Sequence, residues 1–152
     1  MRFLLFLFCL QLLPVLSQEP SSDEQELYEL IMDYRASKGL PNIALSPSLT
    51  KVAQLHSKDL SENRPDQGKC NGHSWSNEGD WTPCCYTSDH KKASCMWDKP
   101  KELTSYQFPG YEISCVGSEP LSPSKALETW KKSKHHNAVI VNKDIWDAPW
   151  KA

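Results

Sequence analysis

The cysteines of this chain constrain its fold more than any other residue type. Apart from Cys9 near the start of the chain, there are five cysteines, and all five lie between positions 70 and 115. Cys84 and Cys85 are adjacent, and neighbouring cysteines do not normally bridge each other, so each should reach a different partner. Extracellular cysteines mostly pair, but five is an odd number, which leaves one thiol free or intermolecular. We expect Cys70, Cys84, Cys85 and Cys95 to staple one loop and Cys115 to be left over.

The start of the chain is typical of a secretion signal. Met1 and Arg2 give a basic start, positions 3–16 are mostly apolar, and Ser17 closes a stretch permissive for cleavage. The apolar run is short for a membrane span, and a retained anchor is the alternative interpretation. We predict a signal peptide at 1–17, a secreted, extracellular protein without a stable membrane span, and one domain over 18–152.

The charge balance excludes some partners. The formal net charge is −2 and no block of like charge dominates, which argues against binding to nucleic acid or to an anionic membrane surface. The hydrophobic fraction of 39% is typical of a globular domain with polar loops.

Local signals predict three helices. The first should begin at Ser21 or Ser22, which have capping-box spacing to Glu24 and Gln25 respectively, and end near Gly39. The second should open at Ser46, which precedes a proline, and the third after Ser122 for the same reason. A further short helix or strand is expected over 135–141. Between 63 and 109 the chain reads as irregular, and 111–116 as a strand.

Two imidazoles and a carboxylate are the candidate site. His73, Glu112 and His136 each lie in a small signature of their own, and such a set can form a polar cleft or hold a divalent metal. Glu112 follows Tyr111 in an apolar stretch, and a buried carboxylate must be paired, hydrogen-bonded or metal-bound. His135 and His136 point about 100° apart on a helix, so only one faces the cleft, and its spacing favours His136.

Two other groupings of polar residues leave alternatives open. His56 shares a face with aliphatic residues of the second helix, so it is either a fourth site residue or a hydrogen-bonded core histidine. The cysteine-rich stretch from Cys70 to Cys95 contains residue types that could form a second zinc site, although secretion favours disulfides there. These residues are Cys70, His73, Cys84, Cys85, His90 and Cys95.

Evidence for an enzyme is thin. Ser74, Ser133, the two site histidines and Glu112 provide residue types for a hydrolase. The chain has neither a Gly-x-Ser-x-Gly elbow nor a His-Glu-x-x-His helix. We leave enzymatic activity uncertain and favour none, with no catalytic residue assigned.

Several segments together resemble the CAP superfamily of cysteine-rich secretory, antigen 5 and pathogenesis-related proteins. The resemblance covers most of Ser22 to Trp150, in a compact variant similar to microbial members. Its residues are Tyr34-Arg35, Leu45-Ser46-Pro47-Ser48-Leu49, the run from Ala53 to Leu60, Gly110-Tyr111-Glu112-Ile113, and Trp130-x-x-Ser133-x-x-His136-Asn137-Ala138.

This resemblance implies a fold and a site. The fold would be α+β, an α-β-α sandwich with a small antiparallel sheet between helices. The cleft would contain His73, Glu112, Ser133 and His136, with Ser133 standing where many members have a second glutamate. Zinc would be held by His73, Glu112 and His136. The insert from Cys70 to Cys95 is similar to that of a subgroup, and the family's final strands are expected to be missing.

We therefore predict a secreted CAP-domain binding protein with a His/Glu cleft. Its ligand would be a divalent metal such as zinc, a lipid or sterol, or another extracellular protein. The alternative is a metal-dependent extracellular hydrolase that uses the same cleft.

Overall fold

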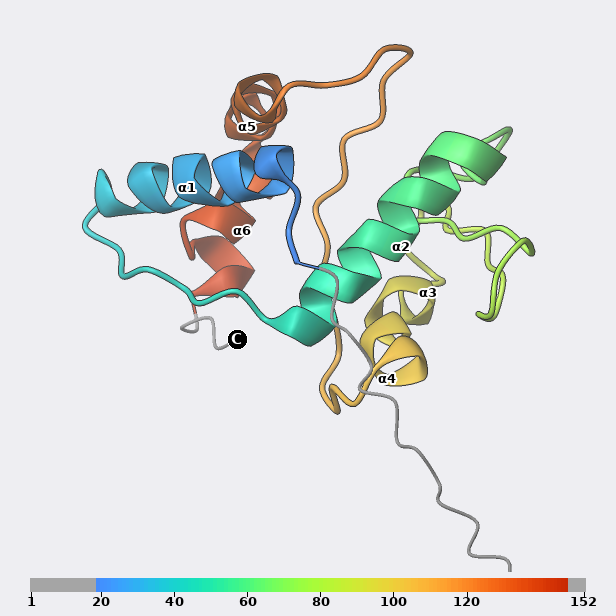
Figure 1. The fold of residues 1–152 in the computed structure, drawn as a ribbon. Helices are drawn as coiled ribbons and strands as arrows, with labels where there is room; N and C mark the ends of the chain where they lie inside the picture. Colours follow the sequence, from blue (N-terminus) through green and yellow to red (C-terminus); the bar gives the residue numbers. More distant parts are fainter. Residues whose placement is uncertain (1–18, 148–152) are drawn as a thin grey trace, which may run out of the picture.

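The computed structural model describes residues 19–147, and these residues form helices joined by long loops. The predicted signal peptide at 1–17 lies outside the described residues. The helices are α1 (Ser22–Ala36), α2 (Pro47–Asn63), α3 (Ser94–Trp97), α4 (Lys99–Leu103), α5 (Pro123–Lys132), α6 (Lys134–Ile140) and the 3-10 helix η1 (Asp144–Trp146) (Figure 1).

The three predicted helix starts are confirmed. Ser21 and Glu24 form the expected capping box at the start of α1. Pro47 occupies the first turn of α2, although the Ser46 side chain makes no capping bond there. The Ser122 hydroxyl accepts the Lys125 N–H and so caps α5. Local sequence therefore determines where these helices begin.

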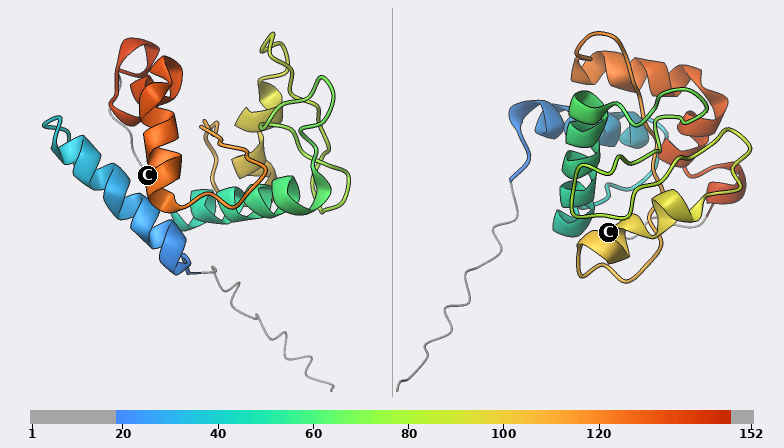
Figure 2. Two further views of the ribbon diagram at one scale, coloured as in Figure 1. Left: turned by 90° about the horizontal axis from the view of Figure 1, so that it is seen from above. Right: turned by 90° about the vertical axis from the view of Figure 1, so that its right-hand side faces the viewer.

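Helices α1, α5 and α6 pack together and enclose the main apolar core (Figures 1 and 2). Its buried residues come from α5, α6 and the position after α6, and partly buried side chains of α1 pack on them; they are Ala126, Leu127, Trp130, Ile140 and Val141. Arg35 ties these helices together at their ends. Its buried guanidinium donates to the Ile140 carbonyl (2.5 Å), to Asn142 Oδ1 (2.7 Å) and to the Pro41 carbonyl.

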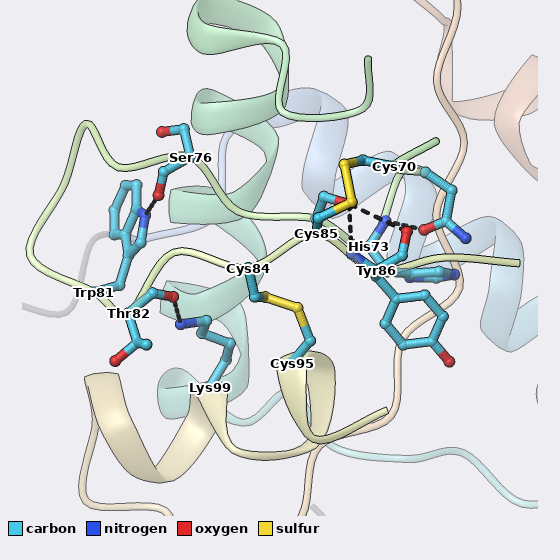
Figure 3. Close-up of a disulfide and its surroundings, with 12 residues drawn as sticks. Cys70, His73, Ser76, Trp81, Thr82, Cys84, Cys85, Tyr86, Cys95 and Lys99 are labelled. Atoms are coloured by element: carbon cyan, nitrogen blue, oxygen red, sulfur yellow. Dashed lines mark hydrogen bonds between the residues drawn. A yellow bond between two sulfur atoms is a disulfide. The ribbon is translucent and has the colours of Figure 1, made fainter. Parts of the chain in front are cut away.

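On the other side of the molecule, α2 packs against α4 (Figure 1). The loop that the disulfides cross-link, from Cys70 to Cys95, lies beside them and is called the stapled loop below. The predicted membership of the staple is confirmed, with disulfides Cys70–Cys85 and Cys84–Cys95 (Figure 3). Cys115 is free, as predicted. The Lys99 amine is buried beside the disulfides, donating to the Thr82 carbonyl (2.5 Å) and to Glu102 Oε2 (2.6 Å). Disulfides and this ammonium thus order a loop that has almost no regular structure.

The predicted α+β sandwich with an antiparallel sheet is wrong for this structure. Residues 19–147 contain no strand, and Trp75 and Cys84 form an isolated antiparallel bridge. The segment 111–116, predicted as a strand, runs between the two groups of helices without strand pairing. A strand is defined by its neighbours, and its apolar pattern alone does not provide one.

Candidate functional site

Glu112 is held between two histidines from different parts of the chain. Its Oε1 lies 2.5 Å from Nδ1 of His56 on α2, and its Oε2 lies 2.7 Å from Nδ1 of His73 in the stapled loop. Glu112 itself lies on the extended segment between α4 and α5. The carboxylate therefore connects the helix, the loop and the extended segment.

The stapled loop positions His73. The Cys70–Cys85 disulfide closes the loop, and the Asn71 N–H donates to the Tyr86 carbonyl (2.9 Å). Asn71 Oδ1 then accepts the backbone N–H of His73 (3.1 Å). Gly72 allows a close approach here, since a Cβ at this position would lie 2.8 Å from Ser114 Oγ and force that side chain to shift. The loop thus approaches the extended segment closely enough for His73 to reach Glu112.

His56 is fixed more firmly than His73. It lies on the inward face of α2 with 2% of its side chain exposed. Its ring stacks on the Trp75 indole, with centroids 4.3 Å apart and planes 9° from parallel. Its second nitrogen, Nε2, lies 3.0 Å from the Ser74 carbonyl. His56 therefore matches both interpretations: it is a buried, hydrogen-bonded core histidine, and it also contacts the site residue Glu112 directly.

The charges of this cluster act on one another. Burial alone would lower the pKa of His56, but the hydrogen bond and charge of Glu112, the Ser74 carbonyl and the charge of Asp59 raise it above its ordinary value. Burial alone would raise the pKa of Glu112, but the hydrogen bonds and charges of His56 and His73 lower it. Both shifts favour a charged His56–Glu112 pair.

His136 and Ser133 lie apart from this direct contact. The Ser133 hydroxyl accepts the His136 N–H and caps α6, which begins one residue later. No hydrogen bond between His136 and Glu112 occurs in the described part of the chain, and Nδ1 of His136 is buried without a partner. Burial lowers the pKa of His136, as do the charges of His73 and His135. Of the three predicted residues, His73 and Glu112 bond directly, and within the described residues His136 is hydrogen-bonded to neither.

The two serines considered for catalysis are both engaged. Ser74 is fully buried, donates to the Tyr86 carbonyl (3.4 Å) and accepts the Tyr86 N–H (2.9 Å). The Ser133 hydroxyl serves as the α6 cap. Neither hydroxyl bonds to an imidazole, as a nucleophile and its base would.

A hollow of about 260 Å³ opens beside Glu112. Its walls come from α2, the stapled loop, the α3–α4 region and the extended segment, and most of them are apolar. The lining residues are Leu49, Val52, Ala53, Trp75, Met96, Lys99, Pro100, Gly110, Tyr111, Glu112 and Ile113. A second hollow of about 390 Å³ lies between α1, α2 and α6 and shares Leu49, Ala53, Tyr111 and Ile113 with the first.

Glu112, one of the three predicted zinc ligands, is already engaged by the protein. Both carboxylate oxygens of Glu112 face histidine nitrogens at hydrogen-bonding distance. No group of three His, Cys, Asp or Glu side chains within 19–147 is arranged to hold a metal ion. Nδ1 of His136 remains as a buried nitrogen without a partner. The alternative zinc site in the insert is excluded, because its four cysteines form disulfides.

Sequence reasoning missed the main partner of Glu112. His56 was weighed as a fourth site residue, but its bond to Glu112 was not foreseen. The apolar face of α2 was the available signal, since a histidine there needs a polar partner. Trp75 stacks on His56 and also lines the hollow.

One comparison with known proteins gave a match. A family model, CAP (cysteine-rich secretory protein family), matches residues 28–145. That range includes His56, His73, Glu112, Ser133 and His136. No curated protein and no solved structure gave a significant match.

Proposed function

Because the chain belongs to the CAP family of cysteine-rich secretory proteins, we propose that it is an extracellular binding module whose ligand is a small lipid-like molecule. The ligand would lie in the hollow beside Glu112. The proposal is for binding without catalysis.

One observation carries this proposal: the Glu112 carboxylate and the hydroxyls of Ser74 and Ser133 already form hydrogen bonds within the protein. Glu112 accepts from His56 and His73, while Ser74 and Ser133 use their hydroxyls on backbone groups. A hydrolytic site needs a free base beside a nucleophile or an activated water. Here the His–Glu–His contact instead supports the wall of a cavity.

The hollow favours an apolar ligand. Leu49, Val52, Met96 and Ile113 line it, and its charged Lys99 is paired with Glu102. Ligand sites are mostly apolar concavities with a few polar groups. Because the second hollow shares part of its lining with the first, an elongated ligand such as a fatty-acyl chain could extend from one into the other.

The disulfides support an extracellular setting. Disulfides form and persist in oxidising compartments, and this chain has two of them in the stapled loop. Within 19–147, none of the helices is long and apolar enough to cross a membrane. Secretion through the segment 1–17 is part of the proposal.

Dodecanol titration tests the proposal. Trp75 lines the hollow, so ligand entry should change the tryptophan fluorescence in a saturable way. Ala53→Phe places a ring in the hollow at a solvent-exposed position and should abolish the change. Ala36→Phe, an exposed alanine outside both hollows, is the matched control and should bind as the parent does. Equal binding by both variants would refute the assignment.

A metal site is the second candidate, and one observation favours it. The buried Nδ1 of His136 lacks a partner, and buried polar atoms normally have one. The candidate ligands are His73 and His136, with Glu112 orienting His73 through its Nδ1 bond. A metal-dependent hydrolase would additionally require turnover of an ester or peptide that is lost in His136→Ala.

A further inference from the structure

His56 occupies an unusual position for a residue of a binding site. It is almost fully buried, and its ring lies flat against Trp75. Rotation about the side-chain bonds would break this stacking. The direction of both ring nitrogens is therefore fixed by packing rather than by the groups they bond.

Both nitrogens of His56 face acceptors. Nδ1 faces a carboxylate oxygen of Glu112 and Nε2 faces the Ser74 carbonyl, at 2.5 Å and 3.0 Å. A carbonyl oxygen only accepts, so Nε2 carries a proton. An ionised carboxylate also only accepts, so Nδ1 is a donor too. His56 thus connects Glu112 to the backbone beside Trp75.

Other contacts also hold the extended segment near Glu112, and the Tyr111 ring packs edge-on against the rings of Trp97 and Trp146. The Gly110 N–H donates to the Trp97 carbonyl (2.9 Å), and the Glu112 N–H donates to Met96 Sδ (3.2 Å), a weak acceptor. No sheet holds this segment in the described part of the chain. The side-chain bonds of Glu112 therefore matter more to its position than they would in a strand.

We infer that His56 is a positioning residue that fixes the carboxylate of Glu112. Through that carboxylate it sets the wall of the hollow at 110–113 and the proton position on His73. This role deepens the proposed function, and its effect on ligand affinity rests on that function. The proton positions on the imidazole rings can be measured without any ligand.

The first test needs no variant. In the ¹⁵N-labelled protein at about pH 8, where exposed imidazoles are neutral, two-bond ¹H–¹⁵N spectra report which ring nitrogens carry protons. We expect a proton on Nδ1 of His56 and a proton on Nδ1 of His73. A His73 that carries its proton on Nε2, or a His56 that lacks a proton on Nδ1, would overturn the inference.

Three substitutions then separate positioning from packing. His56→Phe preserves ring stacking and removes both hydrogen bonds. His56→Asn retains a donor near Nδ1, and His56→Gln retains one near Nε2. We expect the Nδ1 proton on His73 to persist in His56→Asn and to be lost in the other two.

Dodecanol affinity should follow the same order. It should fall by about tenfold in His56→Phe and His56→Gln, the loss expected for one hydrogen bond to a charged group, and by less in His56→Asn. If packing alone mattered, His56→Phe would be nearest to the parent in both readouts, and that order would refute the inference. His135→Phe, an exposed control, should change neither readout.

The two hypotheses can fail separately. If dodecanol does not bind the parent protein, the ligand site is wrong, while the spectra of His56 and His73 still decide the positioning role. If dodecanol binds and the spectra show the unexpected proton positions, the positioning role is wrong and the ligand site stands.

Discussion

His73 and Glu112 are 39 positions apart in the chain, yet Nδ1 of one lies 2.7 Å from Oε2 of the other. The bond joins the stapled loop to the extended segment. It forms because Gly72 lets the loop approach Ser114 closely, and because His56 holds the opposite oxygen of the same carboxylate.

Zinc titration by calorimetry distinguishes the two candidate functions. Because both oxygens of Glu112 accept from imidazoles, the binding-module proposal expects no saturable zinc binding in the micromolar range. The metal-site alternative expects about one ion per chain, with binding lost in His136→Ala and retained in His135→Ala. A saturable isotherm with that dependence would favour the metal site.

Arg35→Met should destabilise the protein strongly. The substitution preserves an apolar stem but leaves the acceptors at Pro41, Ile140 and Asn142 without their donor. The buried Ile140 carbonyl without its donor costs about 1–3 kcal/mol, and the loss of the part-buried bonds to Pro41 and Asn142 adds to it, so we expect a loss of about 2–4 kcal/mol. Urea denaturation measures it.

Arg64→Met is the matched control for that substitution. Arg64 is half exposed and pairs with Asp66 at 3.1 Å, and exposed pairs contribute about 0–1 kcal/mol. A loss in Arg35→Met no larger than in Arg64→Met would contradict the role of Arg35 in joining α1 to the end of α6.

The two disulfides should differ in their effect on ligand binding. Removing Cys84–Cys95 by paired alanine substitutions should cost about 3 kcal/mol through loop entropy, and removing Cys70–Cys85 about the same. Cys84 pairs with the backbone of Trp75, and Cys95 precedes Met96; Trp75 and Met96 line the hollow. Dodecanol affinity should therefore fall more when Cys84–Cys95 is removed, as fluorescence titration of both double variants would show.

The His56–Glu112 pair predicts a window of pH-dependent stability. The raised pKa of His56 means that its contribution is full below 6.5 and is lost as the pH rises through the folded value. The lowered pKa of Glu112 means that its contribution is full above 4.5 and is lost as the pH falls through the folded value.

The difference in unfolding free energy between the parent and His56→Asn should therefore be largest between about pH 4.5 and 6.5. The lowered pKa of His136 acts oppositely below 6.5, but it is present in both chains and largely cancels in the difference. Urea melts across pH 4–9 measure this, and a difference that grows steadily with pH would contradict the pairing.

How far the sequence predicted this structure depended on how local each signal was. Ser21 with Glu24, and Ser122 before a proline, act within one helical turn, and both helix starts were predicted correctly. The four cysteines of the staple were also predicted correctly, and so was the need of Cys84 and Cys85 for different partners. The pairing itself needed the structure.

Signals that depend on distant partners failed. The pattern of 111–116 is typical of a strand, but nothing in that pattern says whether another strand lies beside it. His56 gave the same difficulty, since a histidine on an apolar face reveals its burial and not its partner. The partner, Glu112, is 56 positions away and only the fold brings it near.

The stapled loop has a consequence for where the protein is made. The packing of α1, α5 and α6 contains no disulfide, whereas Trp75 is held beside α3 partly through Cys84–Cys95. A chain produced in a reducing cytosol would therefore retain its three-helix core yet lack an ordered cavity wall. Capture of dodecanol would then report the redox history of a preparation, even where its helical content looked unchanged.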